Sequence, residues 1–435
     1  MRGAPPDQAM HPAFFIIETH GAMRHRLTTL LSTLILFISL PATASSPLSP
    51  DQCQGSAMPY IAPARVAAHP DSLIPVMINH VGRHGARYLS SASQVNKVLD
   101  FLNEAEKSGG TLTPLGVELR QLCNRVTSLS VGHWGALDSL GMDEQEGIAR
   151  RLCEAYPQLV KNSTVEAISS YVPRCIMSMD CFTHEIARCD NSVTIYTSSG
   201  RINSPLMRPF DLDSTYIGYV RREPYKDAYK RYFDQLVSTA PAIRFTTAPL
   251  SDKKLRDGSF AAYRMLSGLQ AMGLEVDLTH YFTIDELNSL WAVHNLDQYL
   301  VRTANCYSTA PADIAAALVR DLVSTTDRVI DGTLDARIQL RFGHAETMMP
   351  LLSFMRLPGC YYVSDNLATV RDHWRNFHVV PMASNLQLKL FRAPSGNYYV
   401  RADLNETPVP LIAGRSDIYI PWNEARTYLL SLLPK

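Results

Sequence analysis

One histidine in this chain stands between two arginines, directly after a long apolar run. Residues 83–88 read Arg-His-Gly-Ala-Arg-Tyr, and residues 74–82 before them predict a buried strand. Positive neighbours lower the pKa of the His84 imidazole and so favour its neutral, nucleophilic form. The guanidinium groups of Arg83 and Arg87 are planar forks that match phosphate oxygens. The stretch therefore indicates an imidazole that attacks a phosphoryl group held by arginine, although such a segment alone would be read as a solvated loop.

A second polar segment lies far downstream, at the end of another predicted strand. Residues 336–341 predict that strand, and Gly343-His344-Ala345-Glu346 leads from it into a helical pattern. His344 could donate to a phosphoryl oxygen, and Glu346 could give a proton to an alkoxide leaving group. The alternative is that Glu346 only favours the helix N-terminus electrostatically. Because ligands in α/β sheets usually bind at strand ends, we expect both segments to belong to one active site.

Together these segments resemble the histidine phosphatase superfamily, histidine acid phosphatase branch. That branch usually carries His-Asp at the second site, whereas the His344-Ala345-Glu346 form, with Tyr88 after the second arginine, resembles the multiple inositol-polyphosphate phosphatases. Residues 173–182, Pro-Arg-Cys-Ile-Met-Ser-Met-Asp-Cys-Phe, are similar to the family's middle motif. Residues 404–406, Leu-Asn-Glu, are a weaker fourth match. The resemblance spans roughly residues 73–410, with the motifs in family order.

The resemblance implies a role for each matching residue. His84 is expected to be the nucleophile that forms a phosphohistidine, and Glu346 is expected to be the proton donor. The expected phosphate-binding residues are Arg83, Arg87, Arg174 and His344. Fixed cationic donors stabilise the transferring phosphoryl group without a metal, so we expect no cofactor. For Arg174 the role depends on the resemblance alone, because an arginine beside a helix start is usually solvated.

Composition and charge are those of an ordinary globular protein. The 435 residues are 46% hydrophobic and 19% charged, with a formal net charge of zero. This length allows a large core in two parts, and the neutral charge argues against a nucleic-acid or bulk membrane partner. The partner that we expect is therefore a small-molecule phosphate ester.

The N-terminal segment is typical of a secretory signal peptide. Residues 23–44 combine a basic start, the apolar stretch Leu27–Leu40 and an Ala-x-Ala cleavage site. We therefore expect a periplasmic or secreted protein without stable membrane association after cleavage. An uncleaved membrane anchor is the alternative, although the apolar stretch is short for a transmembrane span.

All eight cysteines follow the expected cleavage site. An even number in an exported chain favours disulfides, but eight cysteines allow 105 pairings. Free buried thiols are the alternative, especially for Cys175 and Cys181 on a predicted helix.

Strand patterns at both ends of the chain enclose a long helical region. This order predicts a three-layer α/β/α core sheet of the histidine phosphatase type with a mostly α-helical inserted cap. We assign residues 73–199 and 335–435 to the core and residues 200–334 to the insert. Residues 45–72 are expected to form an N-terminal arm, and residues 1–44 to lie outside the fold.

The resemblance implies that the substrates are phytate and other inositol polyphosphates, so the rim of the pocket should be cationic. Basic residues of the insert are candidates for this rim, but each is more simply a solvated position on a helix: Arg221, Arg222, Lys226, Lys230, Arg231, Lys253, Lys254 and Arg256. We therefore leave them out of the predicted site. The alternatives are a broad acid phosphatase acting on sugar phosphates or phosphoglycerates, and a non-catalytic anion-binding protein.

Overall fold

The computed structural model describes residues 47–434, which form one compact unit. The expected signal peptide lies outside the described residues. Across residues 47–434, no helix is both long and apolar enough to cross a bilayer. The segment expected to be an extended arm contains one short 3-10 helix, η1 (Gln52–Ala57), which packs against helices of the core and the insert.

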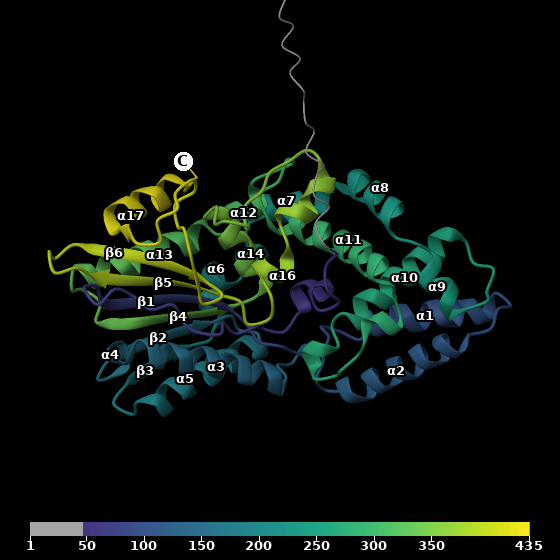
Figure 1. The fold of residues 1–435 in the computed structure, drawn as a ribbon, viewed down its shortest axis with the longest axis horizontal. Helices are drawn as coiled ribbons and strands as arrows, with labels where there is room; N and C mark the ends of the chain where they lie inside the picture. The colour runs from purple at the N-terminus through teal and green to yellow at the C-terminus, as the bar shows by residue number, and fades with distance from the viewer. Residues whose placement is uncertain (1–46, 435) are drawn as a thin grey trace, which may run out of the picture. The chain divides into compact units, whose positions relative to one another are not determined.

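One mixed sheet forms the centre of the fold (Figure 1). Its strands are β1 (Ile74–Arg83), β2 (Thr164–Ser169), β3 (Thr194–Ser198), β4 (Ala336–Gly343), β5 (Asn385–Arg392), β6 (Tyr398–Leu404), β7 (Thr407–Val409) and β8 (Ile420–Pro421). The order is β3-β2-β4-β1-β5-β6-β7, and β8 pairs with β6. Strands β3, β2, β4 and β1 run parallel, whereas β5 is antiparallel to β1 and forms a hairpin with β6. The near-continuous apolar sequence of β1 follows from its central position, since both of its faces are covered.

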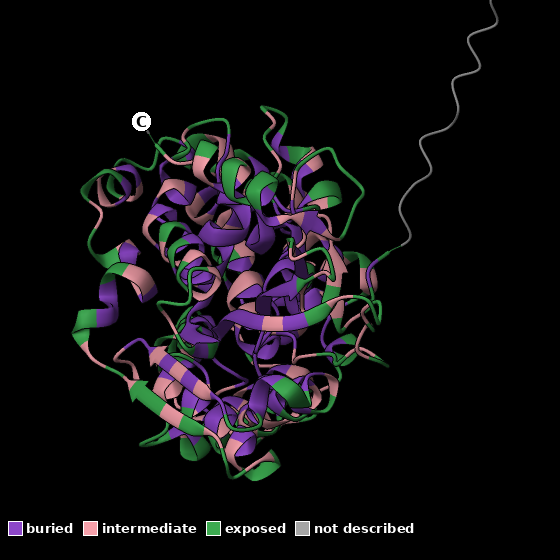
Figure 2. Cartoon of the chain, turned by 90° about the vertical axis from the view of Figure 1, so that its left-hand side faces the viewer, coloured by how far each residue is buried: buried purple, intermediate pink, exposed green. Residues whose placement is uncertain are grey.

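Helices cover both faces of this sheet. One face carries α3 (Ser139–Ala155), α4 (Pro157–Val160) and α5 (Pro173–Cys189), and the other carries α13 (Ala316–Ile330), α14 (Ala345–Phe354) and α17 (Trp422–Ser431). Successive β1 side chains alternate between these layers, because Ile78 packs with α3 and α5 whereas Met77 packs with the opposite cluster. The buried residues concentrate on the strands and on the helix faces that meet them (Figure 2). The predicted three-layer α/β/α class is confirmed.

Between β3 and β4, the named elements of the described chain are all helices. The elements of this insert before α13 are η2 (Arg201–Asn203), α6 (Ser204–Met207), η3 (Pro209–Asp211), α7 (Ser214–Arg222), α8 (Lys226–Leu236), α9 (Ala240–Phe245), α10 (Asp252–Leu266), η4 (Gln270–Met272), η5 (Leu278–His280), α11 (Ile284–Arg302) and α12 (Ala310–Asp313). Two earlier helices, α1 (Ser93–Lys107) and α2 (Pro114–Ser130), pack against α10 and α9 (Figure 1, right). The division of the chain at residues 199 and 335 stays a prediction, since the described residues form one unit.

Short helices complete the fold after α14: η6 (Leu367–Thr369), α15 (Val370–His373) and α16 (Asn376–Val379). Local sequence signals explain several helix starts. Thr113 caps α2 by accepting a hydrogen bond from the Gly116 amide, as the Thr-Pro pair predicts. Thr283 and Glu286 form a capping box at the start of α11. Helix α11 is buried on nearly all sides, so several of its polar side chains, among them Asn288, His294 and Asn295, are buried as well.

All eight cysteines are unpaired in this structure. The disulfides expected from an even cysteine count therefore stay a prediction. Cys175, for which a free buried thiol was the alternative, is fully buried beside His344, with its sulfur 3.2 Å from the Gly343 carbonyl oxygen.

Candidate active site

The pairing of β1 with β4 brings the two predicted motifs together. Arg83, the last residue of β1, pairs with Gly343, the last residue of β4, and the His84 amide donates to the Gly343 carbonyl at 3.0 Å. Because the strands are parallel, both following loops leave the same edge of the sheet. The rings of His84 and His344 lie with their centroids 5.8 Å apart.

His84 is buried and is held in one orientation. Its Nδ1 lies 2.9 Å from the Gly85 carbonyl oxygen, so Nδ1 carries the proton and donates it to that oxygen. Nε2 is then left with a free lone pair. Burial lowers the pKa of His84 well below its usual value, and the charges of Arg83, Arg174 and Arg87 lower it further. The imidazole is therefore neutral around neutral pH, which is the protonation state that a nucleophile needs.

The backbone of the His84 loop lies directly on α3 and α5. A Cβ atom on Gly85 would be 2.2 Å from the Gly141 carbonyl oxygen, and one on Gly141 would be 2.1 Å from the Ala86 carbonyl oxygen. The Gly85 amide donates to Ser178 Oγ, and the Ala86 amide donates to Glu144 Oε2 at 2.6 Å. Because Gly85 and Gly141 have no side chains, the loop can approach α3 closely. The hydrogen bonds from its own backbone amides to Ser178 and Glu144 then hold the loop in place.

The three predicted phosphate-binding arginines line one pocket of about 350 Å³ together with His84. Arg83 is held by the Ser56 and Val380 carbonyl oxygens, which accept from its Nη1. The Nε atoms of Arg83, Arg87 and Arg174 are buried and have no hydrogen-bond partner. Burial, opposed in part by the carboxylates of Glu346 and Glu144, lowers the pKa of Arg83 to about 10. Burial and the charge of Arg83 lower the pKa of Arg87 to about 9. Three guanidinium groups around one pocket provide the charge and the N–H donors that bind an anion such as phosphate.

His344 contacts two arginines, Arg174 from the predicted set and Arg208 from outside it. Arg174 Nη2 is 3.2 Å from its Nδ1, and Arg208 Nη1 is 2.8 Å from its Nε2. Ser170 Oγ is also 2.9 Å from Nε2. Burial and the Arg174 charge lower the pKa of His344 to about 3, so the ring is neutral and orients its neighbours. Sequence reasoning missed Arg208, which stands in the linker between α6 and η3 and carries no motif.

Glu346 lines the same pocket from the first turn of α14. Its carboxylate lies 3.6 Å from Arg302, the last residue of α11. Burial raises the pKa of Glu346, but the charge of Arg302, a backbone hydrogen bond and the charge of Arg83 outweigh this effect and hold the pKa at about 2. With the site empty, Glu346 is therefore ionised. Arg302 was also missed, because the contact joins two helices that lie far apart in the sequence.

Two further residues of the insert complete the wall of the pocket. Arg264 of α10 and His294 of α11 both line it, and neither was predicted. His294 had a signal in the sequence, since it is a polar residue in the apolar stretch of α11; Arg264 had none. The basic insert residues that were left out of the predicted site lie elsewhere, and Lys226, Lys230 and Lys254 form ion pairs outside this pocket.

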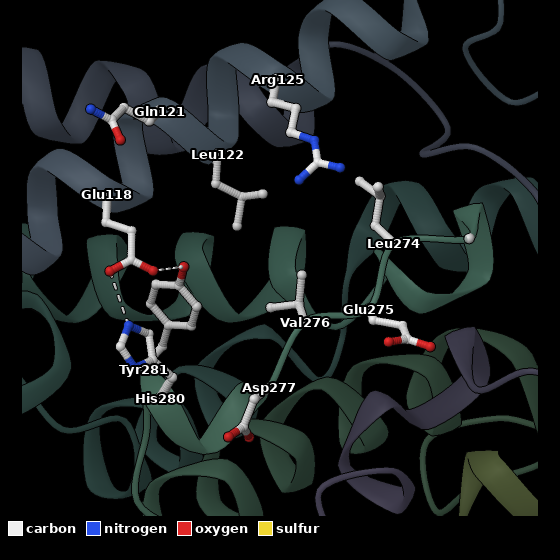
Figure 3. Close-up of a pocket in the computed structure, with 11 residues that line it drawn as sticks. Glu118, Gln121, Leu122, Arg125, Leu274, Glu275, Val276, Asp277, His280 and Tyr281 are labelled. Atoms are coloured by element: carbon white, nitrogen blue, oxygen red, sulfur yellow. Dashed lines mark hydrogen bonds and ion pairs between the residues drawn. The ribbon is translucent and has the colours of Figure 1, made fainter.

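A pocket larger than the one at His84 lies elsewhere in the described chain. One of about 900 Å³ lies between α2 and residues 273–281 (Figure 3). There Glu118 accepts a hydrogen bond from Tyr281 Oη, and its other oxygen is 3.0 Å from His280 Nε2. None of the predicted site residues lines this pocket. In residues 47–434, no cluster of three or more His, Cys, Asp or Glu side chains is arranged to hold a metal ion.

The sequence comparisons define the class of this protein. Residues 257–405 match the family model described as histidine phosphatase superfamily (branch 2). The chain therefore carries a domain of this family, and it is an enzyme of the histidine acid phosphatase type. The resemblance that the motifs indicated is confirmed.

Within that class, the chain is similar to proteins named multiple inositol polyphosphate phosphatase 1. The Homo sapiens protein is 24% identical over 382 residues, covering 78% of this chain and 75% of its own length. The Gallus gallus protein is 23% identical, covering 81% of this chain and 80% of its own length.

Solved structures share the fold. The multiple inositol polyphosphate phosphatase of Bifidobacterium longum, in complex with inositol hexasulfate, matches with a TM-score of 0.72 and 17% identity over 87% of this chain and 97% of that one. The phytase from D. castellii matches with a TM-score of 0.68 and 16% identity over 88% of this chain and 85% of that one.

Proposed function

We propose that this protein is an exported phosphomonoesterase that hydrolyses phytate and other inositol polyphosphates. The observation that carries the proposal is the convergence of the neutral His84 with arginines whose buried N–H groups have no partner. Unpaired buried donors are costly, so a site built from them is matched to an anion that pairs them. The names of the relatives support inositol polyphosphates as that anion.

In the first step, His84 Nε2 attacks phosphorus and the bond from phosphorus to the ester oxygen breaks. Arg83, Arg87 and Arg174 stabilise the charge on the equatorial oxygens. Glu346 gives its proton to the departing alkoxide, which is otherwise a poor leaving group. Nδ1–H remains bonded to the Gly85 carbonyl oxygen, so the imidazole keeps its orientation in the phosphohistidine.

In the second step, water attacks phosphorus and the bond to Nε2 breaks. Glu346, now ionised, takes a proton from this water and is ready for the next cycle. Inorganic phosphate leaves, and neutral His84 is restored. Dividing one difficult displacement into two easier ones is the benefit of a covalent intermediate.

The charge of the bound phosphate explains how Glu346 becomes protonated. In the empty site the cations hold its pKa at about 2. A phosphate dianion that settles among the same arginines offsets their charge and adds negative charge of its own. Both effects raise the pKa of the carboxyl group, so binding of the substrate itself favours the proton that the leaving group needs.

The direct test is phosphate release from phytate by the protein purified without residues 1–44, with EDTA present. We expect steady release by the wild type and a loss of at least about a thousandfold in His84→Ala, because the covalent route is removed. Acid-labile phosphate on the quenched wild-type protein would report the phosphohistidine. Absence of release by the wild type, or equal release by the mutant, would refute the proposal.

Export is proposed from sequence alone, since residues 23–44 are the only segment that bears on it. N-terminal sequencing checks it, on protein recovered after expression of residues 23–435, which begin with Met23 at the start of the expected signal peptide. Export predicts a first residue near Ser45, and retention of Met23 would contradict it.

A further inference from the structure

Helices α3 and α5 lie side by side on one face of the sheet (Figure 1). Near their N-terminal ends, Gly141 of α3 and Ser178 of α5 both contact the loop that carries His84. Near their C-terminal ends, Arg150 Nε of α3 donates to Glu185 Oε1 of α5 at 2.7 Å. The two helices therefore run in the same direction, and they support the loop at one end and meet again at the other.

Two cysteines lie one helical turn beyond this ion pair. Cys153 follows Arg150 by three positions, and Cys189, the last residue of α5, follows Glu185 by four. Residues at these spacings share one face of a helix, so both thiols lie in the same seam as the ion pair. A side-chain hydrogen bond joins Cys189 to Cys153. The two sulfur atoms are thus neighbours, although the residues belong to different helices.

The two thiols differ in their access to solvent. Cys153 is buried, whereas Cys189 is exposed. Burial, and then the hydrogen bond with Cys189, raise the pKa of the Cys153 thiol. Because the thiolate is the reactive form, a buried thiol with a raised pKa reacts slowly with molecules in solution. An oxidant from solution therefore meets Cys189 first, and Cys153 is the partner that waits beneath it.

We propose that Cys153 and Cys189 form a disulfide that fastens the C-terminal ends of α3 and α5 when the protein meets a disulfide oxidant. The Cys189 thiolate attacks one sulfur of the oxidant, and the other sulfur leaves as a thiolate. Cys153 then loses its proton and attacks the Cys189 sulfur, which displaces the second half of the oxidant. In total, two protein thiols are oxidised to one disulfide, and one oxidant disulfide is reduced to two thiols.

This crosslink would stabilise the part of the fold on which the His84 loop rests. It closes a ring that contains α4, β2 and α5, and such a ring restricts the unfolded chain more than the folded one. The proposed export would bring the protein into a compartment where disulfide oxidants are present. The inference itself does not depend on the substrate of the enzyme.

The test oxidises the purified protein and maps its thiols. Residues 45–435 are purified with reductant, transferred to buffer without it and incubated with glutathione disulfide. Free thiols are then blocked with iodoacetamide in denaturant, and the protein is digested without reduction. We expect mass spectrometry to find the Cys153 and Cys189 peptides joined by a disulfide. In thermal unfolding, the Tm of the oxidised protein should exceed that of the reduced protein by roughly 3–10 °C.

Two variants of α5 separate this pair from general oxidation. Cys189→Ser removes the exposed thiol, so its Tm should be the same with and without glutathione disulfide, and Cys153 should be recovered alkylated. Cys181→Ser is the matched control, because Cys181 is a half-buried thiol on the same helix and the charges of Glu146 and Asp180 act on it. This control should keep both the crosslink and the rise in Tm.

Three results would overturn the inference. Recovery of both thiols alkylated after oxidation would show that no disulfide forms. Glutathione that stays attached to Cys189, or a crosslink from Cys189 to a different cysteine, would show that the Cys153 sulfur does not reach it. A crosslink without a rise in Tm would show that it does not fasten the helices. Since no ester is hydrolysed in this assay, none of these results bears on the proposed function.

Discussion

At the scale of single residues, Glu346 has to do opposite things in the two steps of the proposed reaction. It must be protonated when the alkoxide leaves and ionised when water attacks. The ionised form is favoured in the absence of substrate, because Arg302 is 3.6 Å away and the charge of Arg83 also lowers the pKa of Glu346. In the proposed mechanism, the negative charge of the bound substrate therefore raises the pKa of Glu346 and makes it a proton donor. The pKa of Glu346 is not already raised before the substrate binds.

Replacing Glu346 with Gln tests this role through the leaving group. Nitrophenolate leaves without a proton, whereas an inositol alkoxide does not. In the first turnover, measured by rapid quench, we expect Glu346→Gln to slow phytate cleavage by roughly 10²–10⁴-fold and p-nitrophenyl phosphate cleavage at least tenfold less. Because the second step also uses Glu346, the variant should release a burst of nitrophenolate and then turn over slowly. Equal losses on both substrates in the first turnover would count against proton donation.

At the scale of elements, the proposed mechanism requires the His84 loop to lie in close contact with α3. Gly141 is the position where that approach is tightest, since an added Cβ would lie 2.1 Å from the Ala86 carbonyl oxygen. The obstacle is backbone, so it cannot rotate away as a side chain could. The loop would have to move, and the hydrogen bond from the Ala86 amide to Glu144 would be strained.

We therefore expect Gly141→Ala to lower kcat/KM by at least about a hundredfold, the effect of displacing a catalytic group by about 1 Å. Gly147→Ala is its matched control on the same helix. There the added Cβ would lie 3.1 Å from Arg151 Nη1, a nitrogen that Arg151 does not use in its ion pair with Glu406. Replacing a helical glycine with alanine should stabilise the protein by up to about 1 kcal/mol. Circular dichroism and kinetics of the two variants check this contrast. Similar kinetics for both would show that the loop tolerates displacement.

The sequence predicted the strands that end at the His84 and His344 loops and the helices of the insert, but it did not predict which residues of those helices line the pocket. The β1 and β4 segments were predictable because an apolar run that stops at a polar motif is a local signal, and parallel strands bring such ends together. Arg264 and Arg302 lie on helices whose periodicity tells which face is buried but not what lies opposite. The basic residues that looked most conspicuous, such as Lys254, are solvent-facing ion pairs instead.

At the scale of the whole molecule, the core contains ionisable groups whose charged forms it cannot easily hold. His80 is the clearest case, because it is fully buried in β1 with no hydrogen-bond partner on either ring nitrogen. Its ring packs between Phe182 and Phe342, with centroid distances of 5.0 and 5.6 Å. Burial, then the charges of Lys389 and Arg341, lower its pKa to about 3.

Because of His80, the free energy of unfolding should depend on pH, and the direction of this dependence can be predicted. Between pH 6.5 and 3 the unfolded chain binds a proton on His80 and the folded chain does not, so the free energy of unfolding falls as the pH is lowered through this window.

Replacing His80 with Leu removes that dependence and also removes two unsatisfied polar atoms, each costing about 1–3 kcal/mol when buried. Relative to wild type, His80→Leu should therefore gain stability on acidification, by about 1.4 kcal/mol per pH unit at most. Urea unfolding at pH 7 and pH 5 measures this, because His84 and His344 contribute equally to both proteins and cancel in the difference. Parallel pH dependence in the two proteins would mean that the His80 imidazole becomes protonated within the folded core.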